Sequence, residues 1–135
     1  MSIANLKTSI ATALTSNLTN TVVYKRIPEI LDQWPCVVIQ VGPGNNLINM
    51  PHTKQERTLY LDLVLTKAGI IEDIQDQLDT YILPTGTNSM VAAIKQTVCG
   101  TDADWLRVNG DSGPIGLKFG DVQYIGCRWT VIAMI

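Results

Sequence analysis

Histidine occurs once in this 135-residue sequence, as His52, and charged residues make up only 16% of it. A single histidine excludes the clustered imidazoles of the usual zinc sites. The 10 Lys+Arg and 12 Asp+Glu leave a net charge of −2, so no basic excess draws the chain to nucleic acid. Typical domains carry about 25% charged residues. A surface this poor in charge favours a chain that packs against other protein chains.

Long apolar runs are also missing, and cysteines are few. No run approaches the ~18 apolar residues of a transmembrane helix. The first residues, MSIAN, lack the basic and apolar regions of a signal peptide, so we expect no membrane partner. Cys36, Cys99 and Cys127 are odd in number and far apart. They predict buried thiols in a reducing cytoplasm, in preference to a disulfide or a zinc site.

Three segments have the apolar spacing of amphipathic helices. The first begins after a candidate N-cap, Ser2, and repeats its apolar residues at Ile3, Leu6, Ile10, Leu14 and Leu18. The second follows Gly69 and has its stripe at Ile70, Ile71, Ile74, Leu78 and Ile82. The third covers residues 89–98, with Asn88 or Ser89 as cap and Gly100 as stop.

Strand patterns fill the rest. Short runs at 21–25 and 36–41 are rich in β-branched residues, and Gly42-Pro43-Gly44 is expected to end the second. Residues 58–66 alternate leucine with other residues, which predicts a half-buried strand antiparallel to the previous one. Residues 104–108 form a strand before an Asn109-Gly110 turn and a glycine-rich excursion over 111–120. The final strand shares one face among Ile125, Cys127, Trp129, Val131, Ala133 and Ile135.

The predicted order is α-β-β-β-α-α-β-β. Consecutive strands and clustered helices favour one α+β domain over residues 1–135, a mainly antiparallel sheet with helices packed on one face. A long inter-strand loop is the exception to this compact plan.

That loop, at 42–55, is too long for a hairpin and too apolar for a solvated one. It carries large apolar side chains among polar neighbours: Asn45, Asn46, Leu47, Ile48, Asn49, Met50, Pro51 and His52. One interpretation folds it back onto its own domain. The other makes it an interaction arm that docks on a neighbouring subunit or partner, where burying each large side chain contributes roughly 1.5–3 kcal/mol before ordering costs.

Catalytic signals are weak throughout. His52 has no partner histidine, and Asp102 and Asp104 lack the ligand run of a calcium loop. Gly42-Pro43-Gly44 lacks the Gly-Lys-Ser/Thr of a phosphate loop. We predict no catalytic residue, no metal and no cofactor. An acidic helix face is either solvated or lines a channel and repels passing DNA: Glu72, Asp73, Asp76 and Asp79.

The layout resembles that of tailed-bacteriophage tail terminator proteins, also called tail-to-head joining or tail completion proteins. The resemblance covers nearly the whole chain but no single motif is specific. It comprises the first helix, YKRIP at 24–28, WPCVVI at 34–39, the loop, the leucine strand, the helix pair and YIGCRWTV at 124–131.

The resemblance implies a homohexameric ring in the virion, at the head-proximal end of the tail tube. Such a ring ends tube polymerisation and joins the tail to the head connector or stopper protein, and DNA only passes through its lumen. Rival interpretations are another neck component, a small-molecule site lined by Trp105, Tyr124 and Arg128, or a bacterial immunity or regulatory protein.

Overall fold

The computed structural model describes residues 3–18, 21–28, 35–45, 56–67, 71–86, 88–97 and 105–134, with backbone alone at 43–45, 66–67 and 71–75. Within them the chain forms three helices and a six-stranded sheet. In chain order these are α1 (Ile3–Asn17), β1 (Val22–Tyr24), β2 (Cys36–Asn45), β3 (Glu56–Lys67), α2 (Ile71–Ile82), α3 (Met90–Lys95), β4 (Trp105–Asp111), β5 (Ile115–Phe119) and β6 (Val122–Met134).

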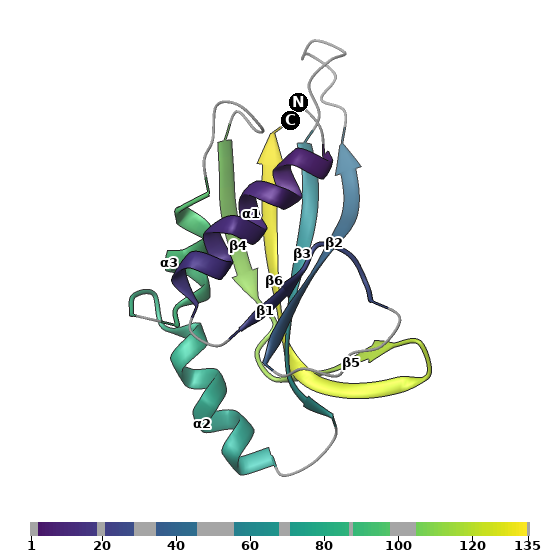
Figure 1. Ribbon diagram of the computed structural model, residues 1–135, viewed down its shortest axis with the longest axis vertical. Helices are drawn as coiled ribbons and strands as arrows, with labels where there is room; N and C mark the ends of the chain where they lie inside the picture. The colour runs from purple at the N-terminus through teal and green to yellow at the C-terminus, as the bar shows by residue number, and fades with distance from the viewer. Residues whose placement is uncertain are drawn as a thin grey trace.

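The sheet has the strand order β1-β2-β3-β6-β4, and β5 pairs with the first part of β6 (Figure 1). β1 and β2 run parallel, while the other pairs are antiparallel. The predicted α+β class and the antiparallel pairing of β2 with β3 are therefore confirmed. β3 and β6 occupy the centre, where Asp62 lies opposite Arg128.

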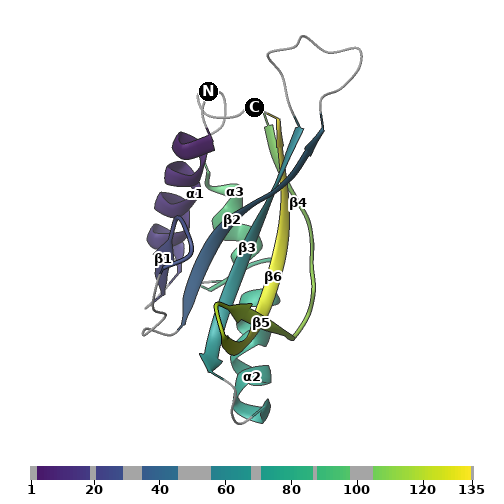
Figure 2. The same ribbon diagram turned by 90° about the vertical axis from the view of Figure 1, so that its right-hand side faces the viewer.

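All three helices cover the same face of the sheet. α1 crosses in front of the strands in Figure 1 and stands to one side of them in Figure 2. It buries Leu6, Ile10 and Leu14, as its spacing predicts, and α3 buries Met90, Ala93 and Ile94. These side chains meet the core-facing side chains of the strands: Val37, Ile39, Leu59, Leu61, Leu63, Leu65, Cys127, Trp129, Val131 and Ala133.

The opposite, helix-free face carries a second and smaller core under the β5–β6 hairpin. Leu117 and Tyr124 of the hairpin cover Cys36, Val38 and Val64. β6 curves to make this possible (Figure 1), and the curve coincides with a register shift between Val64 and Thr66 of β3. The hairpin thus closes one end of the helix-free face and leaves the other end uncovered by described residues.

Two predicted strand ends are wrong. β2 continues through Gly42-Pro43-Gly44 to Asn45, because a bulge after Val41 absorbs the irregular residues. Asn109-Gly110 is no hairpin turn, since β4 runs through it to Asp111 with a bulge of its own. Proline is tolerated in β2 because β1 pairs only with residues 36–38, which leaves the later part of β2 at a sheet edge.

The predicted excursion at 111–120 holds a strand that the sequence pattern missed. β5 occupies Ile115–Phe119, and the turn to β6 is at Gly120-Asp121, with Gly120 at φ 63°. β6 is long enough to pair with β5 along its first part and with β4 along its last part. The helix predicted for 89–98 ends earlier, at Lys95, and Ser89 is its N-cap as expected.

Candidate interaction surfaces

The predicted interaction arm begins where β2 ends, directly opposite the start of β3. Asn45 is the last residue of β2 and pairs with Glu56, the first of β3. The arm is therefore shorter than predicted, spanning residues 46–55 and not 42–55. Asn46, Leu47, Ile48, Asn49, Met50, Pro51 and His52 lie outside the described residues.

The predicted acidic face lies on α2. Asp76 and Asp79 are exposed, and no described residue forms an ion pair with either. Glu72 and Asp73 belong to the same helix, but the structure describes only their backbone. Asp102 and Asp104 lie outside the described residues. The helix packs through Leu78 and Tyr81, which are buried against the sheet. Tyr81 was absent from the predicted stripe, although its spacing of three residues from Leu78 places it on the same face of the helix.

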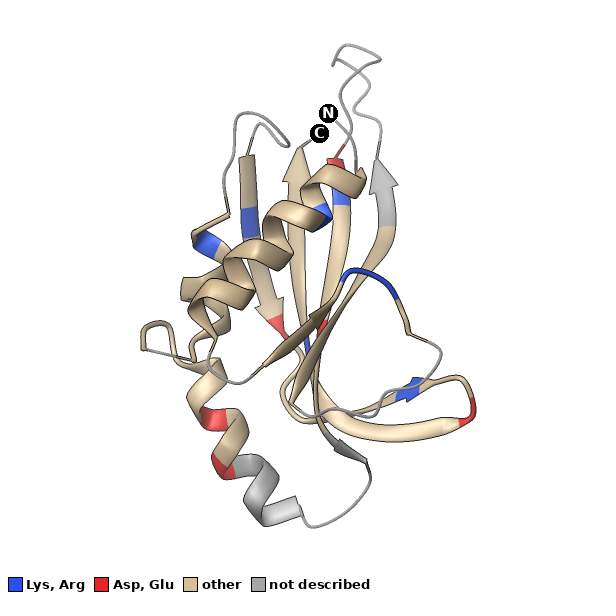
Figure 3. Cartoon of the chain, in the orientation of Figure 1, with Lys and Arg blue, Asp and Glu red and all other residues tan. Residues whose placement is uncertain are grey.

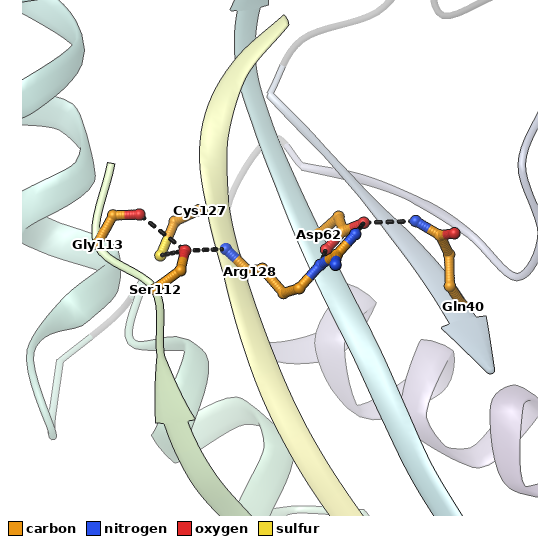
Figure 4. A network of polar contacts seen from close by, with 6 residues as sticks. All are labelled: Gln40, Asp62, Ser112, Gly113, Cys127 and Arg128. Atoms are coloured by element: carbon orange, nitrogen blue, oxygen red, sulfur yellow. Dashed lines mark hydrogen bonds and ion pairs between the residues drawn. The ribbon is translucent and has the colours of Figure 1, made fainter. Parts of the chain in front are cut away.

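A polar cluster lies at the centre of the helix-free face, at the border of the small core (Figure 4). The Asp62 carboxylate is fully buried and accepts two hydrogen bonds from Arg128, Nε to Oδ1 at 2.7 Å and Nη2 to Oδ2 at 3.0 Å. Gln40 donates a third, from Nε2 to Oδ2. Hydrogen bonds to Asp62 raise the pKa of Arg128 above its ordinary value, against the opposing effect of burial.

Tyr60 and Gly42 complete this cluster. The Arg128 guanidinium lies over the Tyr60 ring, 4.6 Å from its centroid. The same ring passes so close to Gly42 that a Cβ there would be 2.7 Å from a ring carbon. Glycine at position 42 thus leaves room for the Tyr60 ring over the sheet, which is a packing role.

A chain of contacts joins Arg128 to the edge of the sheet. The Arg128 backbone N–H donates to the Ser112 hydroxyl at 3.0 Å, and that hydroxyl donates to the Gly113 carbonyl at 2.8 Å. Cys127 Sγ lies 3.8 Å from the Ser112 hydroxyl oxygen (Figure 4). Burial raises the pKa of Cys127, and burial raises that of Cys36 to about 12. Neither thiol is poised as a nucleophile.

Both thiols are expected to resist alkylation in the native protein. With a pKa near 12, the Cys36 thiol is ionised at pH 8 in roughly one molecule in ten thousand. Iodoacetamide at pH 8 should modify Cys36 and Cys127 only after denaturation, measured by peptide mass spectrometry. Because the pKa is raised, any native reaction at Cys36 should increase as the pH rises toward 12. Rapid labelling of either thiol in the native protein at pH 8 would contradict this prediction.

Four large apolar side chains are exposed among the described residues: Ile27 (52%), Val41 (40%), Leu83 (54%) and Trp105 (37%). Ile27 borders a hollow of about 520 Å³ lined by residues 23–28. Trp105 pairs opposite Met134, whereas Tyr124 is buried in the small core. The structure therefore does not bring Trp105, Tyr124 and Arg128 together as the lining of one pocket.

No protein-family model and no curated protein matches this chain. The described residues include no group of three or more His, Cys, Asp or Glu side chains placed to hold a metal. Of the helices in the described ranges, none has the length and apolarity needed to cross a membrane.

Sequence reasoning missed Asp62 as the central residue of the cluster. The alternation of leucine with other residues over 58–66 placed Asp62 on the side of the strand opposite the leucines, together with Tyr60. The missing information was the register, which sets Asp62 opposite Arg128, a residue distant in sequence. A lone aspartate within a leucine-rich strand was the available signal.

Proposed function

We propose that the chain is a structural subunit of a phage virion. In this proposal, six copies form a ring that caps the head-proximal end of the tail tube, ends its polymerisation and joins the tail to the head connector. DNA passes through the lumen without specific contact. The proposal begins from the resemblance in layout, and the following surface features support it.

The single observation that carries the proposal is the one-sided sheet. Three helices cover one face, and beyond the β5–β6 hairpin the other face is left uncovered by described residues. Half-exposed Tyr60 and Ile132 lie there with exposed Trp105 and Arg107, whose guanidinium is 5.4 Å from the Trp105 ring centroid. Aromatic and arginine side chains are enriched at protein interfaces. Such a face suits a subunit that is completed by its neighbours.

The test is the effect of the purified chain on growing tail tubes. Its solution mass should be near six times 14.8 kDa, either alone or after tube protein is added. Electron microscopy should show the ring at one end of each tube and no further elongation. Tubes that grow unchanged would refute the capping function. Binding to the connector but not to the tube would favour a stopper or head-completion protein.

The arm provides a second measurement. Changing Leu47, Ile48 and Met50 together to serine should weaken assembly while the circular dichroism and melting temperature of the monomer stay near those of the wild type. This follows because the three side chains would be buried only in the assembly. Asn46→Ser with Asn49→Ser is the matched control and should assemble normally. A triple variant that unfolds would assign these residues to the core of the domain.

A further inference from the structure

Two surface patches of opposite charge are built in the same way, from two charged residues and one aliphatic residue. The acidic patch consists of Asp76, Asp79 and Leu83, whose spacings of three and four place them along one side of α2 and its C-terminal end. The basic patch consists of Lys25, Arg26 and Ile27, directly after β1. Each therefore combines two exposed like charges with one exposed aliphatic side chain.

The two aliphatic members are the most exposed of the large apolar side chains that the structure describes, Leu83 at 54% and Ile27 at 52%. None of the four charged side chains forms a hydrogen bond or an ion pair with a described residue. Within the described residues the charges are therefore unpaired, and each pair of them lies beside an apolar side chain that is about half exposed. Charged residues bordering an apolar contact are the usual arrangement of a protein interface.

The patches lie at different places on the molecule. The basic patch follows β1, the strand at one edge of the sheet order, whereas α2 packs on the central strands β3 and β6 and on α3. Figure 3 shows the blue segment after β1 well apart from the red positions on α2. One chain therefore presents both halves of a complementary pair without joining them itself.

We propose that the acidic patch of one copy docks on the basic patch of the next copy of this chain. Leu83 then packs against Ile27, beside the hollow of about 520 Å³ lined by residues 23–28. The contact joins two different surfaces, so it is head-to-tail, and repeating it about a rotation axis closes a ring. This inference rests on the proposed ring and assigns Asp76 and Asp79 to a subunit contact in place of the lumen.

Charge reversal on each side tests the contact. One variant carries Asp76→Lys and Asp79→Lys, and the other carries Lys25→Glu and Arg26→Glu. Each should raise the dissociation constant of the assembly by about tenfold or more, since like charges then face each other. The full-length chains are measured by sedimentation and light scattering over a range of concentrations, and circular dichroism verifies that each remains folded.

A mixture of the two variants supplies the decisive result. Each variant alone repels its own copies, but in a 1:1 mixture every contact again joins opposite charges, so rings of even subunit number should re-form. Reversing the exposed Lys118 and Asp121 of the β5–β6 hairpin, by Lys118→Glu with Asp121→Lys, is the matched control and should leave the wild-type mass unchanged. High salt should weaken the wild-type assembly.

The possible failures can be told apart. A wild-type ring that persists in both variants, or a mixture that stays dissociated, would overturn this contact and leave the proposed ring intact. A wild-type dimer would overturn the head-to-tail geometry. A wild-type chain that is monomeric at every concentration would also overturn the contact, whereas the capping function fails only if tubes elongate in the presence of the chain.

Discussion

Replacing Gly126 by alanine should lower the free energy of unfolding by about 3 kcal/mol. A Cβ at this position would lie 1.8 Å from the backbone oxygen of Leu63 and 2.9 Å from its carbonyl carbon. The obstacle is the backbone of the central strand β3, which cannot move aside as a side chain can. Either β6 separates from β3 at this point, or the bend that carries the β5–β6 hairpin over the small core is lost.

Gly116→Ala is the matched control. Its new Cβ would meet the amide end of the exposed Gln123 side chain, which can turn away. Alanine also orders a strand more readily than glycine does, so stability should stay within about 1 kcal/mol of the wild type. Urea titration followed by tryptophan fluorescence measures both variants, because Trp129 is fully buried. Equal stabilities for the two variants would contradict the close approach of β6 to Leu63.

Changing Arg128 to methionine should lower the free energy of unfolding by about 3 kcal/mol. The Asp62 carboxylate is fully buried, and Arg128 supplies two of its hydrogen bonds. Methionine keeps the aliphatic stem over the carboxylate but removes the charge. The Arg128 side chain is itself 37% exposed, so partial access of water keeps the loss at the lower end of the range for broken buried ion pairs.

Removing both charges tests whether the loss of stability comes from leaving the buried Asp62 charge unpaired. The double variant Asp62→Leu, Arg128→Met should return to within about 1.5 kcal/mol of the wild type, because no unpaired charge remains. Arg107→Met is the matched control: Arg107 is exposed on the same face, and its change should stay within about 0.5 kcal/mol. If Arg128→Met is as stable as this control, the Asp62 carboxylate is not buried in solution.

Local periodicity was sufficient where one face of an element alone meets the core. The first helix, the leucine strand and the last strand were predicted with their buried faces, and Leu6, Leu61 and Trp129 are fully buried as expected. In each pattern, apolar residues return to the buried face every 2 residues in a strand or every 3.6 in a helix, and this spacing can be read from the local sequence.

Turn residues were the misleading signal. Gly42-Pro43 and Asn109-Gly110 have the composition of turns, yet both lie in bulges inside strands. A bulge and a turn require similar backbone freedom, and only the neighbouring strand decides between them. β5 was missed because its single fully covered residue, Leu117, packs on a surface made by strands distant in sequence.

The sequence by itself determined the helices, the main strands, the α+β class and the low content of charged residues, because those properties depend on composition and spacing. Only the tertiary structure decided the order β1-β2-β3-β6-β4, the meeting of Asp62 with Arg128 and the separation of the acidic and basic patches. These depend on strand register and on which distant segments become neighbours. Long-range packing sets both, and no local pattern encodes them.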